Sequence, residues 1–196
     1  MDLQQRLIEH FHTSLDLKAH VIEEYAPQIE LAAQQLFHSL ISENKILTCG
    51  NGPSGALAQY CSALLINRYQ HERPGLPAMA LSADSASLTA IAADSHFGDI
   101  YSKQIRALGQ PGDVLLVLSS NGRSASLIQA VQAAHDREMV VVALTGDQDD
   151  LTALLQPDDI EIRIPSDAAA MVNESHLLII HCLCDLVEFQ LFGGME

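Results

Sequence analysis

The chain has few basic residues and no tryptophan. Its 196 residues include 10 Lys and Arg against 25 Asp and Glu, which gives a formal net charge of −15. A surface of this sign repels nucleic-acid phosphates and anionic lipid headgroups, so we expect no direct binding to nucleic acid or to a membrane. The sequence also lacks a cationic leader followed by an apolar segment, and it lacks an apolar run of the roughly 20 residues that a membrane span needs. We therefore expect a cytoplasmic protein.

Cysteine is scarce and shows no metal-binding or redox spacing. The four cysteines are Cys49, Cys61, Cys182 and Cys184, and no pair has the C-x-x-C pattern. This usage predicts reduced thiols and a reducing compartment.

The N-terminal region differs in pattern from the rest of the chain. Its apolar residues recur at helical spacing, and Pro27 is expected to begin a second helix. We therefore predict a helical hairpin over residues 1–43, followed by an α/β core over residues 44–196, within a single domain. The apolar stripe of the hairpin either packs on its own domain or meets a second subunit.

From residue 45 onward, short apolar runs alternate with helical patterns. Runs such as Val114–Leu118 and Val140–Leu144 are typical of strands buried on both faces of a parallel sheet. We predict a doubly wound, five-stranded parallel sheet in the flavodoxin-like order 2-1-3-4-5. The expected strands are 45–49, 77–81, 113–118, 139–144 and 159–164, and the expected helices lie near 54–69, 84–93, 97–107, 123–136 and 167–191.

Two short polar loops follow the first and third predicted strands. They are Cys49-Gly50-Asn51-Gly52-Pro53-Ser54 and Ser119-Ser120-Asn121-Gly122-Arg123-Ser124. Small and hydroxyl residues between a strand and a helix leave backbone N–H groups and serine hydroxyls free beside a helix N-terminus, which favours an anion. The order 2-1-3-4-5 would place both loops at the switch point of the sheet. We therefore predict a crevice for a phosphorylated small molecule; the alternative for the serines is turn and N-cap chemistry.

These motifs, with several others, resemble a known family. The first loop, the segments Asn67–Tyr69 and Arg73-Pro74, the stretch Gly112–Leu116, the second loop, and Ala143–Gly146 with Glu161–Pro165 are similar to the sugar isomerase (SIS) domain. Within it, the chain resembles the phosphoheptose isomerases and the initiator-associating proteins of the DiaA type. The resemblance covers essentially the whole chain and implies a homotetramer that binds a phosphosugar. The implied phosphosugar-binding residues are Asn51, Gly52, Ser54, Asp94, Ser119, Ser120 and Ser124.

The catalytic positions implied by the resemblance are altered. Phosphoheptose isomerases use a zinc ion and a set of His, Glu, Gln and His, and the matching residues here are Tyr60, Leu64, Asn173 and His181. A leucine neither accepts a proton nor binds a cation, and one remaining histidine does not supply the three protein ligands of a catalytic zinc site. We therefore expect no metal and assign no catalytic residue. His181 is either a core histidine with a local hydrogen bond or a relic of the zinc set, and His176 and Glu174 are the candidate substitutes for the lost groups.

Two functions from different classes remain at this point. The first is a non-catalytic oligomeric adaptor of the DiaA type that binds the replication initiator DnaA, with Leu191 and Phe192 near the C-terminus as a candidate contact. The alternative is a sedoheptulose 7-phosphate isomerase with a divergent active site, which would imply zinc. A sensor whose partner affinity changes with sugar phosphate is a third possibility. The altered catalytic positions lead us to expect the adaptor, and thus no enzyme.

Overall fold

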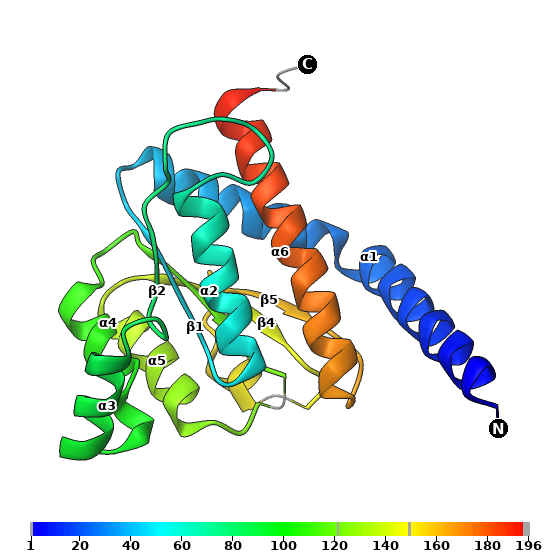
Figure 1. Cartoon of the computed structure of the whole chain (residues 1–196). Coiled ribbons are helices and arrows are strands. Elements are labelled where there is room, and N and C mark those ends of the chain that lie inside the picture. Colours follow the sequence, from blue (N-terminus) through cyan, green and yellow to red (C-terminus); the bar gives the residue numbers. More distant parts are fainter. Residues whose placement is uncertain (1, 121, 149, 194–196) are drawn as a thin grey trace.

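The protein is an α/β structure built around a single parallel sheet (Figure 1), seen in a computed structural model that describes residues 2–120, 122–148 and 150–193. Short 3-10 turns lie at Phe97–Asp99 and Asp150–Leu154. In chain order the helices and strands are α1 (Leu3–Ile41), β1 (Ile46–Gly50), α2 (Pro53–Ile66), β2 (Ala78–Ala80), α3 (Ser85–Asp94), α4 (Ser102–Leu108), β3 (Val114–Leu118), α5 (Ala125–Asp136), β4 (Val140–Thr145), β5 (Ile160–Arg163) and α6 (Ala169–Phe192).

The sheet has the predicted strand order. The five strands are arranged β2-β1-β3-β4-β5, and every neighbouring pair is parallel. In the central pair, Ile46 lies opposite Val114 and Gly50 lies opposite Leu118. Because the strands end level with each other, the loops after β1 and β3 leave the sheet side by side at its carboxyl edge.

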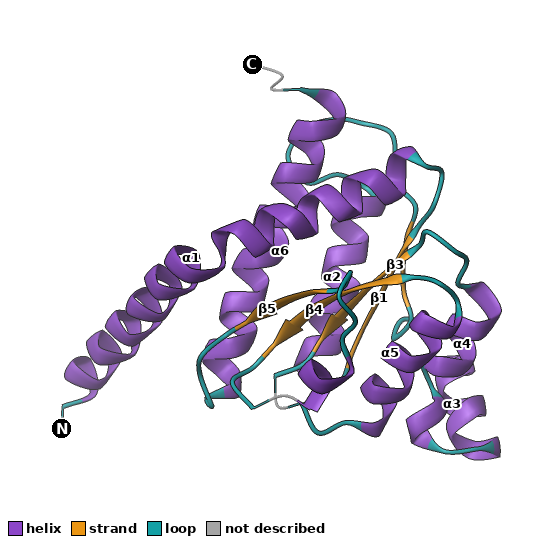
Figure 2. Ribbon diagram, turned by 180° about the vertical axis from the view of Figure 1, so that it is seen from behind, coloured by secondary structure: helices purple, strands orange, loops and turns teal. Residues whose placement is uncertain are grey.

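Each face of the sheet is covered by helices (Figure 2). Alternate strand residues such as Ile46, Leu116 and Leu144 pack with α1, α2 and α6 on one face. Their neighbours, such as Leu47, Leu115 and Ala143, pack with α4 and α5 on the other. The strands are therefore buried on both sides, which explains their nearly continuous apolar sequence.

The predicted N-terminal hairpin is wrong, because α1 is one helix of 39 residues with Pro27 inside it. Proline removes one hydrogen bond from a helix interior and leaves the carbonyl four residues earlier without its donor. Here that carbonyl belongs to Glu23, an exposed residue, so water can replace the lost donor. Beyond Pro27 the helix is fixed by burial of Ile29, Ala32 and Leu36.

The last helix bears on the expectation that the chain has no membrane span. By length and composition, α6 is apolar enough to cross a membrane, and it is the single helix of this kind in the described part of the chain. Ten of its residues are buried, and it packs against α1 and α2. These contacts are those of a helix in a protein core.

Candidate active site

The loops after β1 and β3 are joined by the side chain of Asn51. Its amide nitrogen donates to the hydroxyl of Ser124 at 2.6 Å and to that of Ser126 at 2.9 Å. The Tyr101 hydroxyl donates to the side-chain oxygen Oδ1 of Asn51 at 3.1 Å and to the backbone oxygen of Gly50 at 2.5 Å. Residues more than 70 positions apart therefore form one polar cluster at the switch point of the sheet.

Glycine is required for the tight path of the first loop. Gly52 has a φ of 53° and forms the N-cap of α2, a backbone conformation that residues with a Cβ rarely adopt. A Cβ on Gly50 would lie 2.7 Å from the carbonyl group of Ser54, and one on Gly55 would lie 2.7 Å from the oxygen of Gly50. The end of β1 and the start of α2 therefore pack backbone against backbone.

The serines of the two loops differ in their contacts. Ser119 is buried and its hydroxyl accepts from the N–H of Gly122 at 2.9 Å, which is turn chemistry. Ser124 is the N-cap of α5, yet its hydroxyl does not cap the helix and bonds instead to Asn51. Ser54, also buried, donates to the Asn173 oxygen of α6 at 3.0 Å. Ser120 is half-buried and lies close to the end of β4. A Cβ on Gly146, the residue after β4, would be 2.9 Å from the backbone oxygen of Ser120.

One predicted sugar-binding residue lies outside this cluster. Asp94 is the last residue of α3 and is exposed. No hydrogen bond joins its side chain to the described residues of the two loops.

A second polar contact lies further along the seam between α2 and α6. The Tyr60 hydroxyl and the His181 Nε2 atom are 3.0 Å apart. The ring of Tyr69 stacks on His181, with a centroid distance of 5.8 Å and an interplanar angle of 29°. Tyr60 is 40% exposed and His181 is half-buried, so this pair is accessible from solvent.

The four positions that correspond to the zinc set of the phosphoheptose isomerases do not fit a zinc ion. Leu64 has a hydrocarbon side chain, Tyr60 and His181 bond to each other, and the oxygen of Asn173 is occupied by Ser54. Among the described residues, no group of three or more His, Cys, Asp or Glu side chains could hold a metal ion. The chemistry of the donors present at these four positions is unsuited to zinc.

Comparison with known proteins decides the family. Residues 9–146 match the family described as SIS domain, which is more than half of the chain. The chain belongs to the SIS domain family. A phosphoheptose isomerase from Chromohalobacter salexigens is 54% identical over 197 residues, with both chains fully covered. Another, from Halorhodospira halophila, is 47% identical over 99% of this chain and 98% of the relative.

Solved structures show the same likeness. A phosphoheptose isomerase from Francisella tularensis superposes with a TM-score of 0.90 at 39% identity, covering 96% of this chain and 99% of that one. A second, from Neisseria gonorrhoeae, has a TM-score of 0.89 at 39% identity, with 95% and 99% covered. The expected SIS fold is therefore confirmed over nearly the whole chain.

The relatives overturn the expectation that this SIS domain is not an enzyme. Full-length relatives at 46% to 54% identity are phosphoheptose isomerases. The sequence argument equated the loss of a carboxylate and of zinc ligands with the loss of proton transfer. In the structure, the phenol at the altered position 60 lies in hydrogen-bond contact with the imidazole of the unchanged His181, and both groups can carry a proton.

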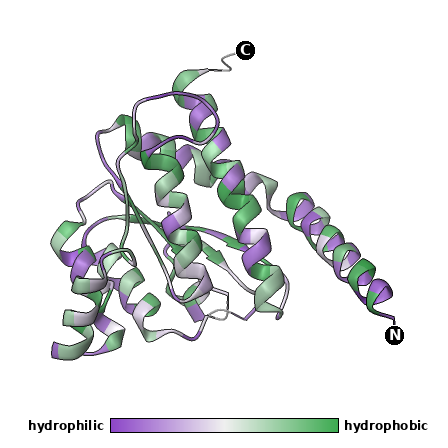
Figure 3. Ribbon diagram, viewed as in Figure 1, coloured by the Kyte–Doolittle hydropathy of each residue, from purple (hydrophilic) through white to green (hydrophobic). Residues whose placement is uncertain are grey.

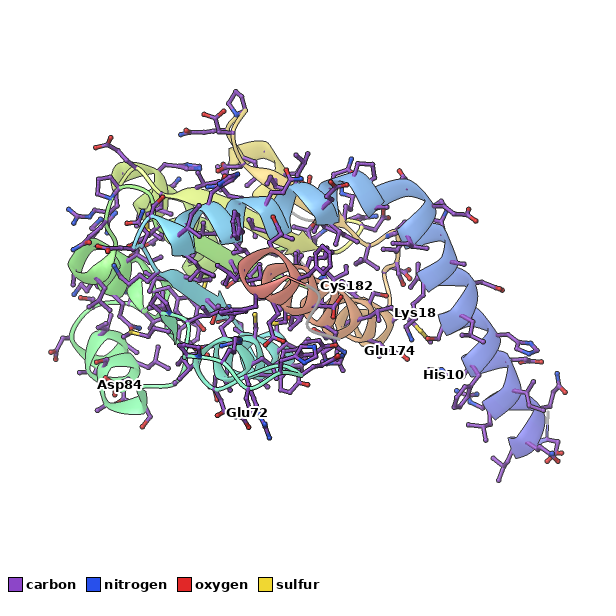
Figure 4. The ribbon with its side chains drawn as sticks, turned by 90° about the horizontal axis from the view of Figure 1, so that it is seen from above. His10, Lys18, Glu72, Asp84, Glu174 and Cys182 are labelled. Carbon is purple, nitrogen blue, oxygen red and sulfur yellow. The ribbon has the colours of Figure 1, made fainter. Side chains whose placement is uncertain are left out.

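His176 and Glu174, the candidate substitutes for the lost groups, do not contact the Tyr60–His181 pair. His176 is fully buried beneath β4, where burial lowers its pKa to about 4 although Nε2 contacts the Thr145 oxygen at 3.3 Å. Glu174 lies on the side of α6 that faces α1, where Lys18 donates to it at 2.6 Å and Ser14 at 3.0 Å (Figure 4). Neither side chain can replace the missing carboxylate.

Sequence reasoning missed the carboxylate that holds the loop bearing Tyr69. Glu188 of α6 is buried and accepts from the backbone N–H of Tyr69 at 2.9 Å and from the Arg73 guanidinium at 2.7 Å. Arg73 also donates to the carbonyls of Leu64 and Leu65 at the end of α2. The signal available in the sequence was an acidic residue, Glu188, flanked by the apolar residues Val187 and Phe189 in α6.

The predicted partner contact at the C-terminus is less exposed than expected. Leu191 and Phe192, the last residues of α6, are half-buried, and Leu191 packs against the core beside α1 and α2. Phe189, at 62% exposure, is the large apolar side chain that faces solvent there.

Proposed function

We propose that this protein is an isomerase that interconverts the ketose and aldose forms of a phosphorylated seven-carbon sugar, sedoheptulose 7-phosphate. The observation that carries the proposal is the full-length likeness to phosphoheptose isomerases, up to 54% identity. The polar cluster around Asn51 supports it, because loops of this kind beside helix N-termini are suited to a phosphate. We take the substrate phosphate to lie against Asn51, Gly52, Ser54, Ser119, Ser120 and Ser124.

The spacing along α2 suits a substrate of this length. Tyr60 follows Ser54 by six residues, which corresponds to about 9 Å of helix rise. In an extended seven-carbon sugar 7-phosphate, the reacting carbonyl carbon and the phosphorus are separated by seven bonds, or about 8 to 9 Å. A phosphate held at the start of α2 would thus bring the reacting carbons beside Tyr60 and His181.

The phosphate assignment is tested by ligand-induced stabilisation. Sedoheptulose 7-phosphate at about 100 times its Kd should stabilise the native protein by about 2.7 kcal/mol, seen as a raised thermal midpoint. The double variant Ser119→Ala with Ser124→Ala should lose most of that shift. The matched control, Ser85→Ala with Ser95→Ala at the two ends of α3, should keep it. A shift that persists in the loop variant contradicts the phosphate assignment.

Self-association as a homotetramer is a further part of the proposal. The first half of α1 projects from the body, and Figure 3 shows apolar residues recurring along it. Leu3, Leu7, Phe11 and Leu15 form a stripe with exposures between 57% and 84%. A separate groove of about 500 Å³ lies between α1 and α6, lined by residues such as Ile22 and Phe189. Apolar faces of this kind favour contact with a second copy of the chain.

Two remaining expectations also stay proposals, and a third is dropped. We place the protein in the cytoplasm, where the free thiols of its four cysteines would persist. We treat the whole chain as one SIS domain. The adaptor role toward DnaA has no supporting observation in the described structure or in the relatives, and we do not pursue it.

A further inference from the structure

We infer that Tyr60 supplies the oxygen-side proton transfers of the isomerisation, in partnership with His181, and that this pair works without a bound divalent metal. The inference rests on the proposed isomerase function and specifies its chemistry. It starts from the disagreement between the phosphoheptose isomerase zinc set and the residues found here, where a phenol and a hydrocarbon stand in place of two ligands.

The geometry gives the pair a defined orientation. The hydrogen bond of 3.0 Å joins α2 to α6, and the stacked ring of Tyr69 fixes the plane of the imidazole. Glu188 and Arg73 in turn fix the backbone of Tyr69. Within the described residues, the second imidazole nitrogen, Nδ1 of His181, has no hydrogen-bond partner. The Tyr60–His181 pair is thus held in place by Tyr69, and Nδ1 of His181 is left to contact a ligand.

The proton transfers balance within this pair. His181 Nδ1 takes a proton from C1 of the ketose, while the Tyr60 hydroxyl gives its proton to the C2 oxygen and regains one from His181 Nε2. The product of this half-reaction is an enediol. Nδ1 then returns the carbon proton to C2, while Tyr60 takes the proton from the C1 hydroxyl and passes one back to Nε2. One hydrogen has moved from C1 to C2 and one from O1 to O2, and both side chains return to their starting states.

The neighbouring side chains favour this arrangement over metal binding. A cation at this seam would have to displace the Tyr60–His181 bond and the Ser54–Asn173 bond, and it would meet the hydrocarbon of Leu64. A phenol and an imidazole in contact need no such rearrangement. Positioned acid and base groups of this type contribute about 10²-fold to 10⁴-fold in rate.

The decisive experiment compares Tyr60→Phe with wild type after exhaustive dialysis against EDTA. Metal content is measured by mass spectrometry, and kcat and KM are measured with sedoheptulose 7-phosphate. We expect no stoichiometric metal, unchanged wild-type turnover in EDTA, and a loss of about 100-fold in kcat for Tyr60→Phe with KM nearly unchanged. Tyr25→Phe, a tyrosine on α1, is the matched control and should keep the wild-type kcat.

The possible failures are distinguishable. Turnover that EDTA abolishes and zinc restores overturns the inference and leaves the isomerase function intact. So does a Tyr60→Phe variant with the kcat of the Tyr25→Phe control. A wild-type protein that shows no turnover with or without added metal overturns the proposed function, and this inference with it. Because Tyr60 is 40% exposed, its variant should keep the wild-type thermal midpoint.

Discussion

At the residue scale, Glu188 connects the stability of the protein to the geometry of its site. Its carboxylate accepts from the N–H groups of Tyr69, Gln70 and His71 as well as from Arg73. Burial alone would raise the pKa of this carboxyl, but the Tyr69 N–H and the Arg73 guanidinium outweigh burial and hold the pKa below its ordinary value. The ionised form is thus the one that the folded state prefers.

Removal of this charge should be costly. Glu188→Gln leaves the Arg73 guanidinium buried without its counter-charge, and we expect the free energy of unfolding at pH 7 to fall by about 3 kcal/mol. Because the folded pKa is depressed, the contribution is present above about pH 4.3 and is lost as the pH falls further. Urea denaturation at pH 7 and pH 3 measures both effects, and the gap between variant and wild type should narrow at pH 3.

An exposed ion pair of the same region provides the control. Arg68 and Glu72 pair at the surface, with side-chain exposures of 47% and 85%. Arg68→Gln should change the free energy of unfolding by less than about 0.5 kcal/mol. Equal losses of unfolding free energy in Arg68→Gln and Glu188→Gln would show that the buried Arg73–Glu188 pair stabilises the fold no more than the exposed pair does.

At the scale of elements, α1 has two halves with different surroundings. Its second half is buried against the core, whereas its first half is attached through Lys18 and Ser14 to Glu174 of α6. The stripe formed by Leu3, Leu7, Phe11 and Leu15 has no partner among the described residues. Self-association would cover this stripe.

Charge placed on the stripe should weaken the assembly. The double variant Leu7→Asp with Phe11→Asp would bury two unpaired carboxylates at such an interface, so we expect light scattering to report a lower molar mass than for wild type. The control is His12→Asp, which adds an exposed charge away from the stripe. A molar mass equal to that of one chain for the wild type, or an unchanged mass for the double variant, would refute this interface.

The elements show where sequence reasoning succeeds and where it stops. The strands were predicted to within a residue or two, because Val114–Leu118 and its neighbours carry unbroken apolar runs between polar turns. The N-terminal hairpin failed because burial of Ile29 and Leu36 outweighs the local effect of Pro27. The predicted helix near 97–107 is a 3-10 turn followed by α4, and that near 54–69 ends at Ile66.

The candidate site was only partly predictable, because its contacts join residues that are far apart in the sequence. The two loops and their shared edge followed from strand order, but the bond from Asn51 to Ser124 joins residues 73 positions apart. Likewise, from the sequence Tyr60 was considered as a replaced zinc ligand and His181 as a relic, each by itself. Their contact depends on how α2 packs on α6. Residue type alone carries no information about such tertiary distances.

At the scale of the whole molecule, the proposed phosphate site and the proposed proton-transfer pair share one structural support. Both lie along α2, which starts at the loop after β1 and runs beside α6. The two parts of the proposed reaction site thus lie on the same helix pair, with the two polar loops at one end and Tyr60 and His181 about two turns along it. This arrangement is consistent with the proposed phosphosugar isomerase, which rests on the full-length likeness to phosphoheptose isomerases.

The most direct test of that assignment is proton exchange at the substrate. Sedoheptulose 7-phosphate is incubated with the wild-type protein in D2O and followed by NMR. The account predicts formation of the aldose phosphate, with deuterium at C2 in each turnover in which the proton held on His181 Nδ1 exchanges with solvent before its return, and a reduced C1 proton signal in the remaining ketose. If the enzyme and the substrate are present at equal concentrations and neither product nor deuterium exchange is seen, the isomerase assignment is contradicted.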